Sequence, residues 1–327
     1  MDINQIAEMA GVSRATVSRY FNDGYVSQEK RERIAQVIEA TGYSPSKRAK
    51  TLRTGKTNVV GVIIPKINSA SVSQMVAGIT GVLNDAGYQV LLANTDNDAA
   101  RELDFLRLFC ERDQVDGIIL IATVLTPEHI EAVKGSKVPV VLLDQSLSGS
   151  PCVYQNDRDA VRDVTTLVLE HARRPAYIGV FEEDVSAGQM RRLGFLDACA
   201  QAGVEVEPGA MAVAEFTVDG GYSCAEEILE ACPGVDAMVC ATDSIAYGAI
   251  TCLREHGRSV PDEVQVTGVG DGEFSQIVVP SLTTVHHHYK TSGSEAATML
   301  VGFMTGKDSV AREVKMGYEV VERDSTL

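Results

Sequence analysis

The sequence has 327 residues, which is too many for one small hydrophobic core and suits two or three domains. Hydrophobic residues make up 45% and charged residues 23%, the balance of an ordinary globular protein, and no apolar run approaches the roughly 20 residues of a membrane helix. The net charge of −16 argues against nucleic acid as a partner of the whole chain.

The charge is divided unevenly along the chain. Residues 1–57 carry ten Lys and Arg against six Asp and Glu, whereas the remainder carries 19 against 39. Because only a surface that lies on a duplex needs to neutralise phosphates, this division predicts a basic DNA-binding module joined to an acidic body. The N-terminus lacks the basic and apolar segments of a signal peptide, so we expect a cytoplasmic protein without a membrane partner.

Three short helices are predicted in residues 1–45. Apolar residues recur at helical spacing over 3–10, Ser13 is a good N-cap for a helix over 14–21, and Ser27 is a good N-cap for a third helix that ends near Gly42. Gly11 makes a tight turn between the first two helices, which is typical of a helix-turn-helix. The second helix would then present a polar face to the major groove, formed by Arg14, Ala15, Thr16, Ser18 and Arg19.

These residue types suit base recognition, because Arg takes guanine bidentately and the methyl groups of Ala or Thr can touch that of thymine. The pattern by itself also fits an ordinary helical hairpin with a polar outer face. Residues 46–57 follow as a basic linker, which separates the helical domain from the body of the chain.

From residue 58 to residue 327 strands and helices alternate. In the first half, strands are predicted at 59–64, 90–93, 117–122 and 138–143, with helices at 73–86 and 99–112. In the second half, strands are predicted at 176–180, 237–240 and 264–268, with helices at 158–170, 190–202, 221–231 and 244–256. The stretch 288–306 ends in a further predicted helix. This alternation indicates two doubly wound parallel sheets in tandem, as two lobes with a ligand cleft between them.

The stretch DINQIAEMAGVSRATVSRYFN resembles the N-terminal signature of the LacI/GalR family of bacterial repressors. The resemblance continues through GYSPSKRAKTLRTGKT, NVVGVIIP, QVDGIIL, VPVVLLD, RRLGF, ATDSIAYG and PSLTTV, and overall the chain is similar to sucrose-operon-type repressors. It implies an all-α helix-turn-helix domain at 1–45, a hinge at 46–57, and a core at 58–327 that resembles periplasmic binding proteins.

For DNA binding, the resemblance implies that Arg14, Ala15 and Arg19 read operator bases, while Ser13, Thr16 and Ser18 contact phosphates. Ala49 and Leu52 match the family's hinge helix, and Leu52 would insert into the minor groove at the centre of the operator.

For the cleft, the resemblance implies that Asp144 and Arg191 bind the effector. A strand-end Asp that caps a turn and a helix-surface Arg are the structural alternatives. Further candidate contacts are Asn68, Ser71, Thr242, Asp243, Asp271 and His287. His286 and His288 would share one face of a strand, but no Cys or carboxylate at ligand spacing accompanies them, so we expect no metal and no cofactor.

The sequence therefore predicts a homodimeric repressor of a carbohydrate operon that binds pseudo-palindromic operator DNA. A small sugar or sugar-phosphate inducer would release it from the operator, and sucrose or another fructose-containing sugar is the first guess. The alternatives are a global carbon-control regulator with a protein corepressor, or a solute-binding protein. The sequence contains no G-x-S-x-G motif, Walker loop or metal cluster, so we expect no enzymatic activity.

Overall fold

The computed structural model describes residues 1–22, 24–43, 56–111 and 114–327. The chain divides into two compact units, Met1–Thr57 and Asn58–Leu327. Ala49 and Leu52, the predicted hinge contacts, lie outside the described residues.

The N-terminal unit contains helices α1 (Ile3–Met9), α2 (Arg14–Tyr20) and α3 (Gln28–Thr41). Asp2 begins α1 with a capping box that involves Gln5, and Ser13 caps α2 by accepting from the backbone N–H of Thr16. Ser27 occupies the N-cap position of α3, as predicted, but its side chain makes no capping bond within the described residues. The three helices share a small core made by Ile6, Ala7, Ala10, Val17 and Ile34.

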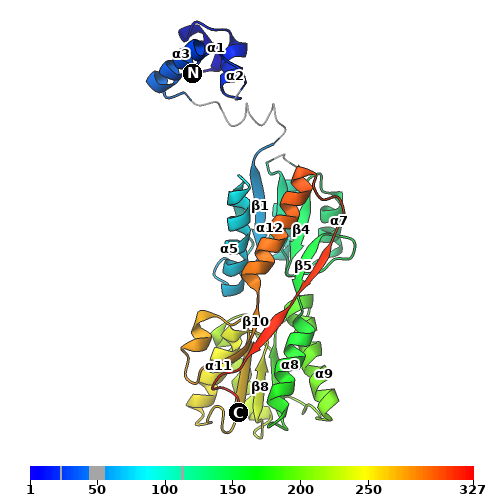
Figure 1. Ribbon diagram of the computed structural model, residues 1–327. Helices are drawn as coiled ribbons and strands as arrows, with labels where there is room; N and C mark the ends of the chain where they lie inside the picture. Colours follow the sequence, from blue (N-terminus) through cyan, green and yellow to red (C-terminus); the bar gives the residue numbers. More distant parts are fainter. Residues whose placement is uncertain (23, 44–55, 112–113) are drawn as a thin grey trace. The chain divides into compact units, whose positions relative to one another are not determined.

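The first lobe of the larger unit contains a six-stranded parallel sheet in the order β11-β5-β4-β3-β1-β2 (Figure 1). Its strands are β1 (Val59–Ile64), β2 (Gln89–Asn94), β3 (Gly117–Ile121), β4 (Val140–Leu143), β5 (Cys152–Gln155) and β11 (Glu313–Met316). Helices α5 (Ala70–Asp85) and α12 (Tyr289–Thr305) cover one face, and α6 (Ala99–Glu111) and α7 (Pro127–Gly135) cover the other.

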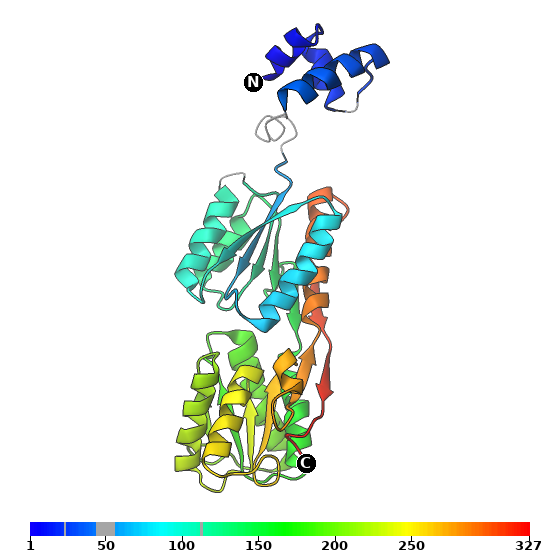
Figure 2. The same ribbon diagram turned by 90° about the vertical axis from the view of Figure 1, so that its left-hand side faces the viewer.

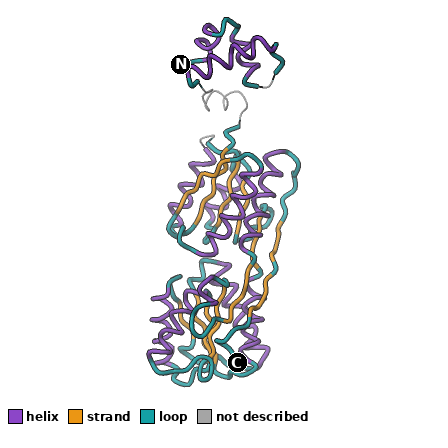
Figure 3. The backbone as a smooth tube through the Cα atoms, turned by 60° about the vertical axis from the view of Figure 1, so that its left-hand side comes forward, coloured by secondary structure: helices purple, strands orange, loops and turns teal. Residues whose placement is uncertain are grey.

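The second lobe contains a six-stranded sheet in the order β12-β10-β9-β8-β6-β7. Its strands are β6 (Pro175–Gly179), β7 (Met211–Val213), β8 (Ala237–Cys240), β9 (Gln265–Val269), β10 (Thr283–His287) and β12 (Tyr318–Val321). Its helices are α8 (Asp157–Leu169), α9 (Arg191–Ala202), α10 (Val218–Ala231) and α11 (Asp243–Glu255), with a π-helical turn at Val185–Met190 and a 3-10 turn at Glu273–Gln276. As Figure 3 shows, helices flank the strands in both lobes, as predicted for this fold class.

The two lobes are interleaved, and the predicted tandem order is therefore incomplete. After the second lobe has formed, the chain returns to the first lobe as α12 and β11, and then crosses again to β12, so that three segments connect the lobes (Figure 2). β12 also pairs antiparallel with β10, which departs from the predicted all-parallel sheets. Sequence reasoning missed β11 and β12 because both are short and half-exposed, without a buried apolar run.

Helices α5 and α12 pack unusually closely against each other, although they are far apart in the sequence. A Cβ atom at Gly78 would overlap the Lys290 carbonyl oxygen, and one at Gly293 would overlap the Met75 carbonyl oxygen. These two glycines therefore permit the backbone contact that fixes α12 to the first lobe. Within the described ranges, no helix combines the length and apolar character that a bilayer crossing requires.

Candidate functional sites

The exposed face of α2 is the candidate DNA-reading surface. Arg14, Ala15 and Arg19 are exposed, whereas Val17 on the opposite face is fully buried against α1 and α3. The helix is therefore anchored by its apolar side and leaves the two guanidinium groups free to approach a base edge.

The turn between α1 and α2 is held from α3. Gly11 has a φ of +60°, a left-handed conformation that favours glycine. The Arg33 guanidinium donates to the backbone carbonyl oxygens of Ala10, at 2.5 Å, and of Gly11, at 3.0 Å. These bonds satisfy carbonyl groups at the end of α1 and fix the angle at which α2 leaves it.

The predicted phosphate contacts are partly engaged within the helix. The Ser13 and Thr16 hydroxyl oxygens lie 2.9 Å apart, and the Asn22 side-chain amide lies 3.4 Å from the Ser18 hydroxyl oxygen. Each hydroxyl keeps some hydrogen-bonding capacity for a further acceptor. Ser13, Thr16 and Ser18 thus lie beside the exposed arginines on one helix.

A buried polar cluster lies where the two lobes meet. Its members come from the carboxyl ends of strands or from the first residues of the helices that follow them. We call it the inter-lobe cluster, and it comprises Asp144, Gln155, Asp157, Asp184, Arg191 and His287.

Arg191 and Asp157 form the centre of the cluster. The Arg191 Nε donates to Asp157 Oδ1 at 2.7 Å, and its Nη1 donates to the Ala241 carbonyl oxygen at 2.6 Å; both charged side chains are almost fully buried. Burial opposes ionisation of Asp157, but the Arg191 guanidinium and His287 outweigh it and lower the pKa of Asp157 to about 2. Arg191 is therefore not an ordinary helix-surface residue, and removing either partner would leave the other charge buried without its counter-ion.

Asp144 follows β4 with a φ of +74°, in the left-handed region that Asp tolerates better than most residues. Its backbone carbonyl oxygen accepts from the Ser186 hydroxyl of the second lobe at 2.6 Å, and its Oδ1 is buried without a hydrogen-bond partner among the described residues. Burial and the charge of Asp157 raise the pKa of Asp144 to about 7. The carboxyl group is thus held between the lobes with one acceptor unused.

Gln145 forms a second bridge between the lobes. Its side-chain amide donates to the Thr123 carbonyl oxygen of the first lobe at 3.0 Å and to Asp184 Oδ1 of the second at 2.9 Å. Asp184 also accepts from the backbone N–H of Ala187, at the start of the π-helical turn, and burial raises its pKa to about 6. The bond between Gln145 and Asp184 holds the lobes in the arrangement described.

His287 completes the cluster at the end of β10. It is fully buried, its Nε2 lies 3.5 Å from Asp157 Oδ1, and neither ring nitrogen has a hydrogen-bond partner within the described chain. Burial lowers the pKa of His287, so its imidazole is neutral near pH 7. A neutral imidazole offers one donor and one acceptor to a neighbouring group.

The other predicted effector contacts do not join the cluster. Asp243 accepts from the Gly272 backbone N–H and from the Ser275 and Thr284 hydroxyls, while Thr242 caps α11. Asp271 pairs with His286 and Arg323 within the second lobe. Asn68 is exposed, and Ser71 bonds to the Ser69 hydroxyl at the start of α5. These residues are placed beyond the strand ends, but their polar groups are largely engaged locally or face solvent.

Sequence reasoning missed Gln155, Asp157 and Asp184. Gln155 and Asp157 flank the point where β5 passes into α8, and the short run CVYQ was not recognised as a strand. With that strand identified, the rule that ligand contacts follow strand ends would have selected both residues. Asp184 precedes a π-helical turn, which has no periodic signal in the sequence.

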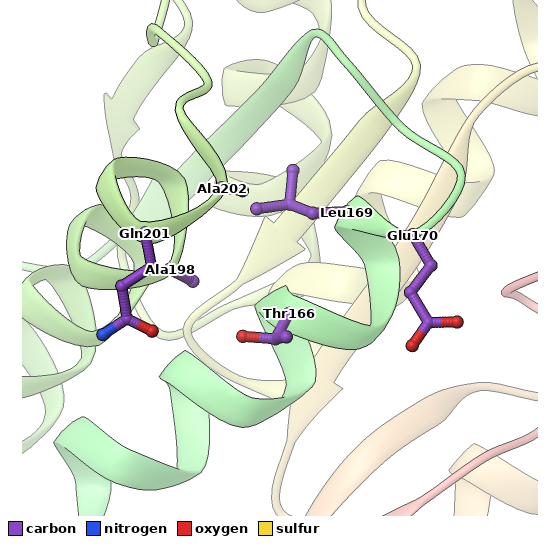
Figure 4. A pocket seen from close by; sticks show the side chains of 6 residues that line it. All are labelled: Thr166, Leu169, Glu170, Ala198, Gln201 and Ala202. Atoms are coloured by element: carbon purple, nitrogen blue, oxygen red, sulfur yellow. The ribbon is translucent and has the colours of Figure 1, made fainter.

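A surface depression of about 280 Å³ lies away from the cluster, between α8 and α9 (Figure 4). It is lined by Thr166, Leu169, Glu170, Ala198, Gln201 and Ala202. Its lining is largely apolar and it contains none of the predicted contacts. In the part of the chain that the structure describes, no group of three or more His, Cys, Asp or Glu side chains is placed to hold a metal ion.

Comparisons with known proteins match both units. Residues 2–46 match the model of the bacterial regulatory proteins of the lacI family, and residues 164–326 match a periplasmic binding protein-like domain. The chain is 32% identical to the sucrose operon repressor of Staphylococcus xylosus, over 91% of this chain and 92% of that protein. It is 30% identical to the transcriptional regulator RegA of Clostridium saccharobutylicum, over 99% of both chains, and to catabolite control protein A of Priestia megaterium, over 99% and 98%.

Among solved structures, the chain is similar to the transcriptional regulator CelR in complex with cellobiose, with 26% identity, a TM-score of 0.77 and 99% of both chains covered. It also shares the fold of the lac repressor dimer bound to operator and the anti-inducer ONPF, with 23% identity, a TM-score of 0.89, and coverage of 100% of this chain and 99% of that one.

Proposed function

This chain belongs to the lacI family of bacterial regulatory proteins, and from this premise we propose that it is the dimeric repressor of a carbohydrate-utilisation operon. A small sugar or sugar phosphate bound between the lobes would release it from operator DNA. The observation that carries this proposal is the inter-lobe cluster, in which buried acceptors beside a charged pair have no partner within the residues that the structure describes. An operator is bacterial chromosomal DNA, so the protein would act in the cytoplasm.

In the DNA-bound state, Arg14, Ala15 and Arg19 would contact bases in the major groove, and Ser13, Thr16 and Ser18 would contact phosphates. The exposure of the two arginines on α2 supports this assignment. Ala49 and Leu52 would belong to a hinge over residues 46–57, between a reader at 1–45 and a sensor core at 58–327.

A dimer would bring two readers to the two half-sites of an operator. Support comes from apolar side chains that the single chain leaves uncovered: Phe274, Ile277 and Val279 after β9, and Leu91 and Leu92 on the edge strand β2. The lac repressor structure, whose fold this chain shares, is a dimer bound to operator.

The effector would bind Asp144, Arg191 and His287, with Asn68, Ser71, Thr242, Asp243 and Asp271 as outer contacts. Binding would compete with the two bonds that hold the lobes together, from Gln145 to Asp184 and from Ser186 to Asp144. A ligand that favours another lobe arrangement would lower DNA affinity by shifting the population toward that arrangement.

A global carbon-control regulator that acts with a protein corepressor is the second candidate, because the chain is 30% identical to catabolite control protein A. Unsatisfied polar atoms buried between the lobes favour a small effector over a protein partner, since a protein surface cannot reach them. Loss of operator binding on addition of a sugar alone would decide for the small effector.

The test is selection of DNA from a random pool by the full-length protein, with Arg19→Ala and Lys30→Ala compared. We expect enrichment of an inverted repeat, and Arg19→Ala should weaken binding to it about ten- to a hundredfold, as for a lost bidentate base contact. Lys30→Ala, an exposed basic residue of α3, should keep the sequence preference. Absence of any enriched sequence would contradict the proposal.

A further inference from the structure

In the inter-lobe cluster, the buried polar atoms without a hydrogen-bond partner in the described chain are mostly acceptors. Three buried side-chain oxygens of the cluster have no hydrogen-bond partner in the described part of the chain: Asp144 Oδ1, Gln155 Oε1 and Asp157 Oδ2. Gln155 and Asp157 are almost fully buried, and the Gln155 amide nitrogen is already committed to the Ser292 hydroxyl at 2.9 Å. Among the residues that the structure describes, the neutral His287 adds one unpaired donor and one unpaired acceptor to these three oxygens. The site therefore needs mainly hydrogen-bond donors, because each buried acceptor without a partner costs free energy.

The cluster is also unequal in charge. It contains the carboxyl groups of Asp144, Asp157 and Asp184 against the single guanidinium of Arg191, and that guanidinium is already bonded to Asp157. His287 is buried and neutral and adds no positive charge. An anionic group that enters the cluster would be repelled by at least two ionised carboxylates, those of Asp157 and Asp184. It would also have to compete with Asp157 for the Arg191 guanidinium.

Neighbouring basic side chains do not change this balance. Arg192 pairs with Glu182 at 3.3 Å, and Arg323 pairs with Asp271. Lys66 follows β1 at the carboxyl edge of the first sheet and is half-buried, so it is a basic group that a phosphate ester could recruit.

We infer that the effector is an uncharged, multiply hydroxylated sugar, and that its phosphate esters are rejected. The inference rests on the proposed function, and it narrows the sugar or sugar-phosphate choice left open there. Sugar hydroxyls supply donors to Asp144 Oδ1, Asp157 Oδ2 and Gln155 Oε1 and remain neutral on burial. Adjacent hydroxyls also match the spacing of the two oxygens of one carboxylate.

The test uses the full-length protein, a DNA fragment that it has selected, and pairs of sugars that differ by one phosphate. Suitable pairs are sucrose and sucrose 6-phosphate, ribose and ribose 5-phosphate, and cellobiose and its phosphate ester. Thermal shift without DNA reports binding, and fluorescence anisotropy with DNA reports release. In the pair to which the protein responds, we expect the unphosphorylated sugar to bind at least tenfold more tightly than its phosphate ester. It should also release the DNA at a concentration at least tenfold lower.

Two variants locate the effect. Asp144→Asn removes the ionisable carboxyl group with little change of shape. It should weaken binding of the neutral sugar at least tenfold and reduce the ratio of its affinity to that of the phosphate ester. Asp197→Asn, which removes a carboxylate that pairs with Arg158 on the surface of the second lobe, is the matched control and should change neither.

The outcomes separate the two proposals. If a phosphorylated sugar stabilises the protein and releases it from DNA while its unphosphorylated parent does neither, this inference is overturned and the proposed function stands. The result has this meaning whether or not Lys66→Ala abolishes the response to the phosphorylated sugar. Binding of a neutral sugar without any change in DNA affinity would uphold the inference and contradict the proposed regulation. No response to any pair, with DNA binding intact, would contradict both.

Discussion

Glu102 and His129 form a buried pair in the first lobe that lies outside the inter-lobe cluster. Both side chains are almost fully buried, Glu102 Oε1 lies 3.6 Å from His129 Nε2, and neither atom has a hydrogen-bond partner within the described chain. Burial, together with the charge of Asp184 from the second lobe, raises the pKa of Glu102 to about 8, and burial lowers the pKa of His129. At neutral pH the pair is therefore uncharged.

This pair makes the stability of the core depend on pH. A carboxyl group whose pKa is raised by folding stabilises the folded state below its unfolded pKa, and this contribution is lost as the pH rises through the folded pKa. Glu102→Gln should therefore increase the free energy of unfolding relative to the parent. This increase should be larger at pH 8.5 than at pH 5.5, by on the order of 2 kcal/mol. Because the chain lacks tryptophan, urea unfolding would be followed by circular dichroism. An equal effect at both pH values would show that Glu102 is already ionised in the folded core.

At the scale of elements, the contact between α5 and α12 decides the architecture of the first lobe. It joins residues 70–85 to residues 289–305, and so it ties the late part of the chain to a lobe that begins at residue 59. The contact is close enough that Gly78 and Gly293 have no room for a side chain. Such backbone contact is specific, because a methyl group on either helix would force the pair apart.

Two glycines of the same helix test this contact. Gly78→Ala should destabilise the core by about 1–3 kcal/mol, since its new methyl group would overlap the Lys290 carbonyl oxygen. Gly81→Ala is the matched control: nothing lies within 4 Å of a Cβ there, and Ala should stabilise α5 by roughly 0.5–1 kcal/mol. Urea unfolding of both variants measures the difference. Equal effects of the two substitutions would mean that the helices do not approach this closely.

At the scale of the whole molecule, the apolar side chains that remain exposed are the strongest sign of assembly. The segment that contains Phe274, Ile277 and Val279 leaves 65–81% of each of these residues exposed, although each is apolar. Isolated exposed apolar residues are ordinary, whereas three within six positions are typical of a contact surface.

Ile277→Asp should therefore convert the proposed dimer to a monomer in analytical ultracentrifugation, because it places a charge in an apolar interface. Operator affinity should fall at least a hundredfold once the two readers are no longer joined, while the thermal shift with the effector persists. Val310→Asp is the control, since Val310 is equally exposed but lies outside the segment. A monomeric parent protein, or a variant that remains dimeric, would refute this assignment of the interface.

Much of this protein was readable from its sequence. The capped helix α2, the strands at 59–64 and 237–240 and the two-lobed α/β core follow from local signals, because caps, turns and apolar periodicity act over a few residues. The family was predicted from the resemblance of whole sequence stretches to its known members. The exposed face of α2 was likewise predicted from the spacing of its residues on one short helix. The base and phosphate contacts assigned to these residues stay predictions.

The tertiary structure alone decided how the lobes interleave and which polar residues meet between them. Asp157 reads as an ordinary helix-start residue until the fold brings it to Arg191, and no local pattern indicates that the Thr284 and Ser275 hydroxyls donate to Asp243. These pairings join residues that are 32 to 41 positions apart in the sequence. Burial and charge pairing depend on such long-range contacts, and local sequence patterns carry no information about them.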